Sequence, residues 1–203
     1  MKILIYFITL FIFSTFAFAC DNKNSDINFN NKENNMNNDN MPNNPKYAYF
    51  SSGCFWGVEY WFEKAEGVFS AISGYAGGHK ANPTYIEVCT GLTGHLETVK
   101  VGYDADKTTY EDLIKLFFET HNFTQKNGQG PDIGSQYLSA IFYQNEEEKE
   151  IAEKYINILK EKGFDVATTL REFKNFYEAE DYHQDYYFKK GTVPYCHFYN
   201  KIF

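Results

Sequence analysis

The chain has 203 residues and a formal net charge of −8, from 27 acidic and 19 basic side chains. This acidic balance argues against a nucleic-acid partner, because proteins that bind phosphate backbones present basic patches. The four cysteines include no Cys-x-x-Cys pair, which excludes a zinc ribbon and a thioredoxin-type motif, and no metal site is expected.

The first 46 residues are expected to precede the folded domain. Residues 1–19 carry Lys2, an apolar run too short to span a bilayer and small residues before Cys20, a pattern typical of a signal peptide. Cys20 resembles the lipidated cysteine of a bacterial lipoprotein, and an ordinary secretory signal cut at the same bond also fits. Residues 20–46 are rich in Asn and poor in large apolar groups, which predicts a flexible tether. We therefore expect an exported protein, either a membrane-anchored lipoprotein or a periplasmic or other extracytoplasmic protein.

Residues 47–203 have the length of one domain with a substantial core. Hydrophobic spacing predicts the following elements. They are a strand at 47–52, a helix at 55–65, strands at 68–75 and 96–103, a helix capped by Thr108 that runs to His121, a strand at 136–144, a helix at 146–162 and a strand at 165–170. Residues 84–89 fit either a short helix or irregular structure. This order predicts an α+β domain: a two-layer ferredoxin-like sandwich with a mixed sheet and an irregular C-terminal tail.

Cys54 lies in the segment Gly53-Cys54-Phe55-Trp56-Gly57, between a predicted strand and a predicted helix. A helix N-terminus offers free N–H groups and the positive end of the helix dipole, so we expect a lowered pKa and a reactive thiolate. The flanking glycines permit a tight turn, and the two aromatic residues can wall an apolar pocket around the sulfur. The alternative is an inert, buried thiol.

Five separated motifs carry the strongest signal in the sequence. They are GCFWGVEYWF (53–62), GYAGG (74–78), NPTYIEVCTGLTGHLE (82–97), QGPDIGSQY (129–137) and FYEAEDYHQDY (176–186). Together, and in this order, they resemble the A-type peptide methionine sulfoxide reductase family over nearly the whole domain. The resemblance implies a peptide-methionine (S)-S-oxide reductase. Such an enzyme uses a thiol to reduce methionine S-sulfoxide, free or in oxidised proteins and peptides, and so repairs oxidised proteins.

The resemblance also implies a role for each matched polar residue. Cys54 corresponds to the nucleophile that attacks the sulfoxide sulfur, and Glu97 to the acid that protonates the sulfoxide oxygen. Tyr85 and Tyr137 correspond to the hydroxyls that hold this oxygen. The chemistry requires such groups, because a sulfoxide oxygen leaves poorly unless it is protonated. A carboxyl group stays protonated near neutral pH only where burial raises its pKa.

The remaining implied roles concern the substrate methyl group and the return of the enzyme to its reduced form. Phe55 and Trp56 correspond to the walls around the methyl group, and Asp132 to a supporting carboxylate. Attack would leave Cys54 as a sulfenic acid, which Cys196 would convert to a disulfide for reduction by a thioredoxin-like donor or another dithiol. No cofactor is implied, and a monomer is expected. The residues before Tyr195-Cys196, Gly191-Thr192-Val193-Pro194, depart from the family's usual Asn-Pro-x-Gly.

Two other functions are consistent with the same residues. The first is a cysteine acyl-transfer hydrolase that uses Cys54 and His183. The second is a non-catalytic, membrane-tethered binding module in which Phe55, Trp56 and Tyr85 line a pocket for a thioether or a methyl group.

Overall fold

The structure, a computed structural model, describes residues 41–203. The predicted signal peptide, Cys20 and most of the predicted tether lie outside the described residues. The strands are β1 (Pro45–Ser52), β2 (Val68–Ala76), β3 (Leu96–Asp104), β4 (Gly128–Gln129), β5 (Asp132–Ile133), β6 (Ser139–Tyr143), β7 (Thr169–Glu172) and β8 (Phe176–Glu178). The helices are α1 (Phe55–Glu63), α2 (Tyr85–Cys89), α3 (Tyr110–Glu119), α4 (Glu146–Glu161) and α5 (Tyr186–Lys190), with a 3₁₀ turn η2 (Ser135–Tyr137). Between residues 41 and 203, no helix is long and apolar enough to cross a membrane.

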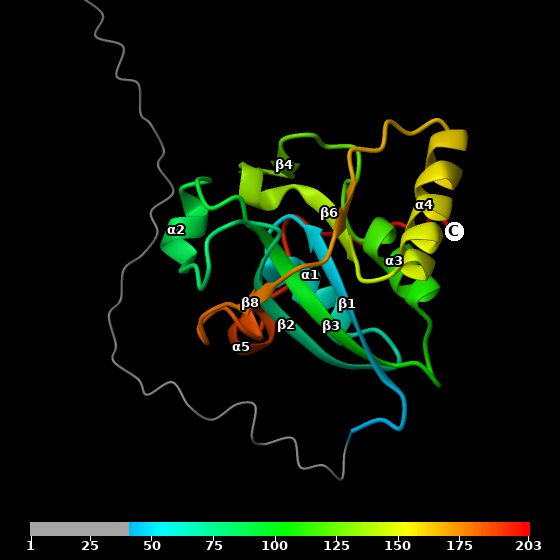
Figure 1. Cartoon of the computed structure of the whole chain (residues 1–203), viewed down its shortest axis with the longest axis horizontal. Coiled ribbons are helices and arrows are strands. Elements are labelled where there is room, and N and C mark those ends of the chain that lie inside the picture. Colours follow the sequence, from blue (N-terminus) through cyan, green and yellow to red (C-terminus); the bar gives the residue numbers. More distant parts are fainter. Residues whose placement is uncertain (1–40) are drawn as a thin grey trace, which may run out of the picture. The chain divides into compact units, whose positions relative to one another are not determined.

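Six strands form the main sheet, in the order β7-β6-β1-β3-β2-β8 (Figure 1). The strands β6, β1, β3 and β2 pair antiparallel with one another, and β8 pairs antiparallel with β2. β6 and β7 pair in parallel, so the sheet is mixed. Residues 192–203 form no helix or strand. The predicted α+β class, mixed sheet and irregular C-terminal tail are confirmed.

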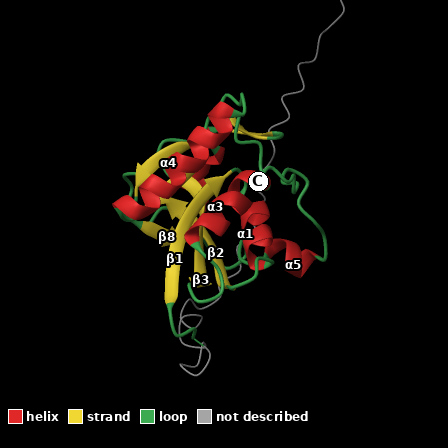
Figure 2. Ribbon diagram, turned by 90° about the vertical axis from the view of Figure 1, so that its right-hand side faces the viewer, coloured by secondary structure: helices red, strands yellow, loops and turns green. Residues whose placement is uncertain are grey.

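The two faces of the sheet are covered differently. Side chains alternate along β1, so Phe50 points to one face and Tyr49 to the other. Phe50 packs on Phe62 of α1 at 5.0 Å and on Phe117 of α3 at 5.4 Å between ring centroids. Both helices therefore lie on one face of the sheet, and Figure 2 shows α1 to the right of the strands β1, β2 and β3. On the other face, Tyr49 stacks on Phe173 at 3.9 Å.

This alternation and one glycine turn place Glu97, the predicted acid, and Cys54, the predicted nucleophile. On β3, Glu97 has the same side-chain direction as Val99 and Val101, which belong to the core beneath the helices. Between β1 and α1, Gly53 adopts φ +104°, and a Cβ there would lie 2.4 Å from the Cβ of Gln129. Only glycine fits this turn. Cys54 follows as the N-cap of α1 and is therefore on the same side of the sheet as Glu97.

Several predicted element boundaries need correction. Helix α1 ends at Glu63 rather than at 65, and the cap of α3 is Thr109 rather than Thr108. Thr109 Oγ1 accepts a hydrogen bond from the Asp112 N–H at 3.1 Å, one residue later than the predicted capping box. Residues 135–137 form a 3₁₀ turn, so the strand predicted at 136–144 starts at 139. The last predicted strand is shifted to 169–172, and the segment at 84–89 is helical from 85.

Candidate active site

A hydrogen bond between the helix start and the sheet forms the centre of the site. The Phe55 backbone N–H, in the first turn of α1, donates to Glu97 Oε2 at 3.0 Å. Glu97 is 1% exposed and Cys54, the preceding residue in that turn, is 7% exposed. The structure therefore brings the predicted nucleophile and the predicted acid together inside the protein.

The expectation of an acidified Cys54 is wrong for the protein without substrate. Burial is the largest influence and raises the pKa of the Cys54 thiol well above its ordinary value, with further increases from the charges of Glu97 and Cys196. Only the Trp56 backbone N–H acts in the opposite direction. The helix start is therefore not sufficient to ionise the sulfur. The thiol keeps its proton near neutral pH.

The expectation that burial raises the pKa of the Glu97 carboxyl is confirmed. Burial raises the pKa of its carboxyl to about 8, and the charge of Asp132 adds to the rise, against the lowering effect of the Phe55 N–H. Glu97 is therefore mostly protonated near neutral pH, as a proton donor must be.

Tyr85 and Tyr137 both lie near Glu97. Burial raises the pKa of each hydroxyl, and the charge of Glu97 adds to the rise in both cases. Both hydroxyls therefore keep their protons and can donate hydrogen bonds. Glu180 holds Tyr85 in place: its Oε1 accepts from the Tyr85 N–H at 3.0 Å, and its Oε2 accepts from the Tyr75 hydroxyl at 2.8 Å.

Phe55 and Trp56 form part of an aromatic cluster with residues from the C-terminal region. The Phe55 ring lies 6.4 Å from Tyr85 and 4.9 Å from His183 between centroids. Trp56 stacks on Tyr186 at 3.7 Å with the planes 4° apart. These contacts fix both predicted wall residues in the first turn of α1, directly after Cys54.

His183 cannot act as the base that an acyl-transfer hydrolase needs. The Trp56 indole N–H donates to its Nδ1 at 3.1 Å, which occupies the acceptor nitrogen of the neutral ring. Burial lowers the pKa of His183 to about 4, so the ring is neutral near pH 7. The ring orients Trp56, so His183 is not available as the general base that the hydrolase alternative assigned to it.

Asp132 lies on the short β4–β5 hairpin and contacts the C-terminal tail. The Tyr195 hydroxyl donates to its two carboxylate oxygens at 3.0 and 3.2 Å. The charge of Asp132 also raises the pKa values of Glu97 and Cys196, so the carboxylate lies near both. Gly128 makes this hairpin possible, because a Cβ there would lie 2.0 Å from the Asp132 carbonyl oxygen.

Cys196 is 4% exposed and is held firmly, which excludes a stray thiol in a loose tail. The Gln129 side-chain amide donates to the Cys196 carbonyl at 2.8 Å. The next residue, His197, bonds through Nε2 to the Ser52 carbonyl at 2.7 Å, two residues before Cys54. Both thiols are free. The tail therefore brings the predicted second thiol to the turn that carries the first.

Sequence reasoning missed four residues that build the site. Glu180 and Tyr186 lie in the motif 176–186, and Gln129 opens the motif 129–137, so their positions were marked but not their contacts. His197 follows Cys196 outside all five motifs, and no sequence signal distinguished it. Each acts through a partner far away along the chain.

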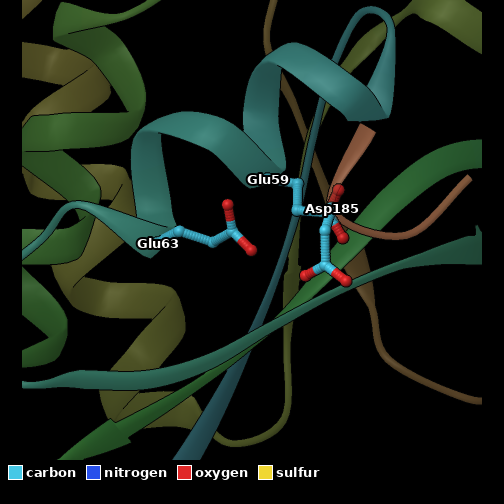
Figure 3. Close-up of side chains that lie close together, drawn as sticks. All are labelled: Glu59, Glu63 and Asp185. Carbon is cyan, nitrogen blue, oxygen red and sulfur yellow. The ribbon is translucent and has the colours of Figure 1, made fainter. Parts of the chain in front are cut away.

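One group of acidic side chains within residues 41–203 is close enough to be considered as a metal site. Carboxylate oxygens of Glu59, Glu63 and Asp185 lie within 4.8 Å of one another (Figure 3). Glu59 is 1% exposed, and burial, with the charges of Glu63 and Asp185, raises its pKa to about 8. Because Glu59 is then largely protonated, the group lacks one of the charges that would hold a cation. We assign no metal to it.

Comparisons with known proteins agree with the site. The family model for "Peptide methionine sulfoxide reductase" matches residues 46–202. A "Peptide methionine sulfoxide reductase MsrA" from Natronomonas pharaonis is 49% identical over 152 residues, 73% of this chain and 85% of that protein. The protein of the same name from Nautilia profundicola is 47% identical over 149 residues, 73% of this chain and 86% of that protein.

Solved structures give the same result. Reduced Mxr1 from Saccharomyces cerevisiae superposes with a TM-score of 0.72 at 33% identity, over 79% of this chain and 94% of that one. Methionine sulfoxide reductase A of Corynebacterium diphtheriae superposes with a TM-score of 0.67 at 36% identity, over 76% and 78% of the two chains. Mxr1 in complex with Trx2 matches at a TM-score of 0.52 and 23% identity, which shows the fold alone.

These matches confirm the resemblance drawn from the five motifs. The chain belongs to the peptide methionine sulfoxide reductase family, and it is an oxidoreductase that reduces methionine sulfoxide.

Proposed function

We propose that Cys54 and Glu97 carry out the reduction of methionine S-sulfoxide, free or within oxidised proteins, and that Cys196 completes the cycle. The observation that carries the proposal is the hydrogen bond from Phe55 N–H to Glu97, which holds a buried, un-ionised carboxyl beside the Cys54 thiol. A neutral acid next to a thiol suits a substrate whose oxygen must be protonated as it leaves sulfur.

In the first step, Cys54 Sγ attacks the sulfoxide sulfur while Glu97 gives its proton to the sulfoxide oxygen. Glu97 then takes up the proton that the thiol loses, so the carboxyl passes a proton from thiol to oxygen. The bond between the two sulfurs and the substrate S–O bond then break and an S–O bond forms on Cys54, so the thiol and the sulfoxide give a Cys54 sulfenic acid and a thioether, with two electrons transferred to the substrate sulfur. Such a relay explains how a thiol of raised pKa can react near neutral pH.

Two features of the site favour this substrate. The un-ionised Tyr85 and Tyr137 hydroxyls can donate hydrogen bonds to the oxygen as its charge grows. The fixed aromatic rings of Phe55 and Trp56 offer an apolar surface to the methyl group on the substrate sulfur.

In the second step, Cys196 attacks the sulfenic acid, a Cys54–Cys196 disulfide forms and water leaves. The two thiols supply both electrons, so the cycle needs no prosthetic group. A thioredoxin-like donor then reduces the disulfide. Two observations support this partner: Mxr1 has been solved in complex with Trx2, and the exposed apolar side chains of Val193, Tyr195 and Phe198 flank Cys196.

We also propose that the enzyme acts outside the cytoplasm. The basis is the sequence of residues 1–46 alone, in which a signal peptide precedes Cys20 and an Asn-rich tether follows it.

Glu97→Gln tests the proton donor, because Gln keeps the side-chain shape but has no acidic proton. We expect methionine formation in the first turnover to slow by about 10²–10⁴-fold, the usual contribution of proton transfer. In the wild type, this rate should fall as the pH rises above about 8, where Glu97 loses the proton that it must donate. Quenched-flow assays with a peptide methionine S-sulfoxide measure both effects.

The matched control is Glu172→Gln, which alters an exposed carboxyl on the edge strand β7 and should leave the rate and its pH dependence unchanged. The R epimer should not be consumed. A Glu97→Gln protein with the wild-type rate, or consumption of the R epimer alone, would contradict the proposal.

Cys196→Ser tests the second thiol. We expect a normal first turnover, one equivalent of methionine, and then no further turnover with thioredoxin, because the Cys54 sulfenic acid has no thiol to meet. Cys89→Ser, the control for the third cysteine of residues 41–203, should continue to turn over. Undiminished steady-state turnover of Cys196→Ser with thioredoxin would remove the proposed role.

Cys20→Ala tests the membrane anchor. If Cys20 carries a lipid, the wild-type protein should fractionate with membranes, and the variant should move to the soluble fraction or remain unprocessed. Mass spectrometry of the mature N-terminus identifies the modification directly. Protein that remains in the cytosol with Met1 intact would overturn the proposed export.

A further inference from the structure

The imidazole of His197 faces the Cys196 sulfur. Its Nδ1 lies 3.2 Å from Cys196 Sγ, and its Nε2 lies 2.7 Å from the Ser52 carbonyl oxygen. A carbonyl oxygen can only accept a hydrogen bond, so Nε2 carries the ring proton and Nδ1 presents its lone pair to the thiol. His197 Nδ1 can therefore accept a proton from the Cys196 thiol, a contact that the proposed cycle does not use.

Packing fixes this pair in place. His197 is 1% exposed. A Cβ on Gly57 would lie 2.2 Å from His197 Nδ1, so α1 approaches the ring closely only because residue 57 is glycine. The Trp61 indole N–H donates to the His197 carbonyl at 3.4 Å, and Gln129 holds the Cys196 carbonyl at 2.8 Å. These two bonds hold the backbone of residues 196 and 197, while the Nε2 bond to Ser52 and the close approach of α1 hold the ring itself.

Cys196 needs a proton acceptor in order to react. Burial, with the nearby charge of Asp132, raises the pKa of its thiol, so little thiolate forms near neutral pH. Burial lowers the pKa of His197 to about 4, so its ring is neutral over the same range and Nδ1 is free to accept. A buried thiol of raised pKa thus stands in contact with a buried, unprotonated imidazole.

From this geometry we propose that His197 Nδ1 accepts the Cys196 thiol proton as Cys196 attacks oxidised Cys54, an inference that rests on the proposed function. The S–S bond forms as the S–O bond of the Cys54 sulfenic acid breaks. The leaving oxygen takes a proton from Glu97 and departs as water, and the proton on His197 passes on to restore Glu97 or to solvent. No further oxidant or reductant enters the step.

Other titratable groups face this pair and must be distinguished from His197. Asp132 on β5 also hydrogen-bonds the Cys196 thiol, and its carboxylate accepts from the Tyr195 hydroxyl as well, but its charge disfavours a neighbouring thiolate. Tyr187 on α5 and Glu97 on β3 also face the two thiols. His121, which follows the C-terminal end of α3, faces His197, and burial lowers its pKa to about 3, so it too is neutral. Asp132 is the one rival acceptor among them.

His197→Gln tests the proposal, because the Gln amide can still donate to the Ser52 carbonyl while the basic nitrogen is lost. The full-length reduced protein is mixed with a peptide methionine S-sulfoxide, quenched at intervals and analysed for methionine and for the disulfide by mass spectrometry. We expect normal methionine formation and disulfide formation slowed by about 10²-fold or more.

Between about pH 6 and 7.5, the wild-type disulfide rate should change little, because the ring remains neutral. In His197→Gln it should rise about tenfold per pH unit, because only the thiolate then reacts.

Two variants serve as controls. His121→Gln also removes a buried imidazole and should keep the flat pH profile. Asp132→Asn should keep it as well, and a steep profile there would transfer the role to Asp132. A wild-type disulfide rate and a flat profile in His197→Gln would overturn the proposal. If His197→Gln forms no methionine in its first turnover, His197→Asn replaces it as the test variant. Its Oδ1 can still accept a hydrogen bond from the thiol but is not basic, so the rate of disulfide formation should again rise about tenfold per pH unit. A wild type that forms methionine but no disulfide would instead refute the role of Cys196.

Discussion

The hydrogen bond from the Phe55 N–H to the Glu97 carboxyl is the constraint on which the rest of the site depends. It joins the first turn of α1 to the middle strand β3 and keeps a carboxyl group buried beside the thiol. Glu97 accepts a hydrogen bond from the Phe55 N–H, one of the free N–H groups at the start of the helix. This N–H group is therefore not available to stabilise a Cys54 thiolate. The helix N-terminus therefore positions an acid and a thiol together rather than ionising the thiol.

A second set of contacts closes the site from the C-terminal side. Glu180 orients Tyr85, His183 orients Trp56, and the tail residues 196 and 197 reach the turn before α1. The tail has no regular structure, so single hydrogen bonds from Gln129 and to Ser52 fix its position instead of a helix or strand ladder. Such an arrangement holds Cys196 near Cys54 and keeps both thiols out of bulk water.

Sequence reasoning succeeded where the signal is local. Hydrophobic spacing predicted a strand at 96–103 and a helix at 146–162, and β3 and α4 lie within one residue of these bounds. It failed where a property depends on distant partners. The pKa of Cys54 is set by burial under chain segments that no helix-start argument includes. The bond between His197 and Ser52 joins residues 145 positions apart, and the bond between Gln129 and Cys196 joins residues 67 positions apart. Neither spacing follows from periodicity.

The central claim is that Glu97 is un-ionised next to Cys54 in the resting enzyme. Infrared difference spectroscopy between the wild type and Glu97→Gln, recorded as a function of pH, isolates the carboxyl C=O stretch of this residue. The account predicts a protonated carboxyl band that persists at neutral pH and disappears only as the pH passes about 8. A carboxylate band already present at mildly acidic pH, with no protonated form near neutrality, would contradict it.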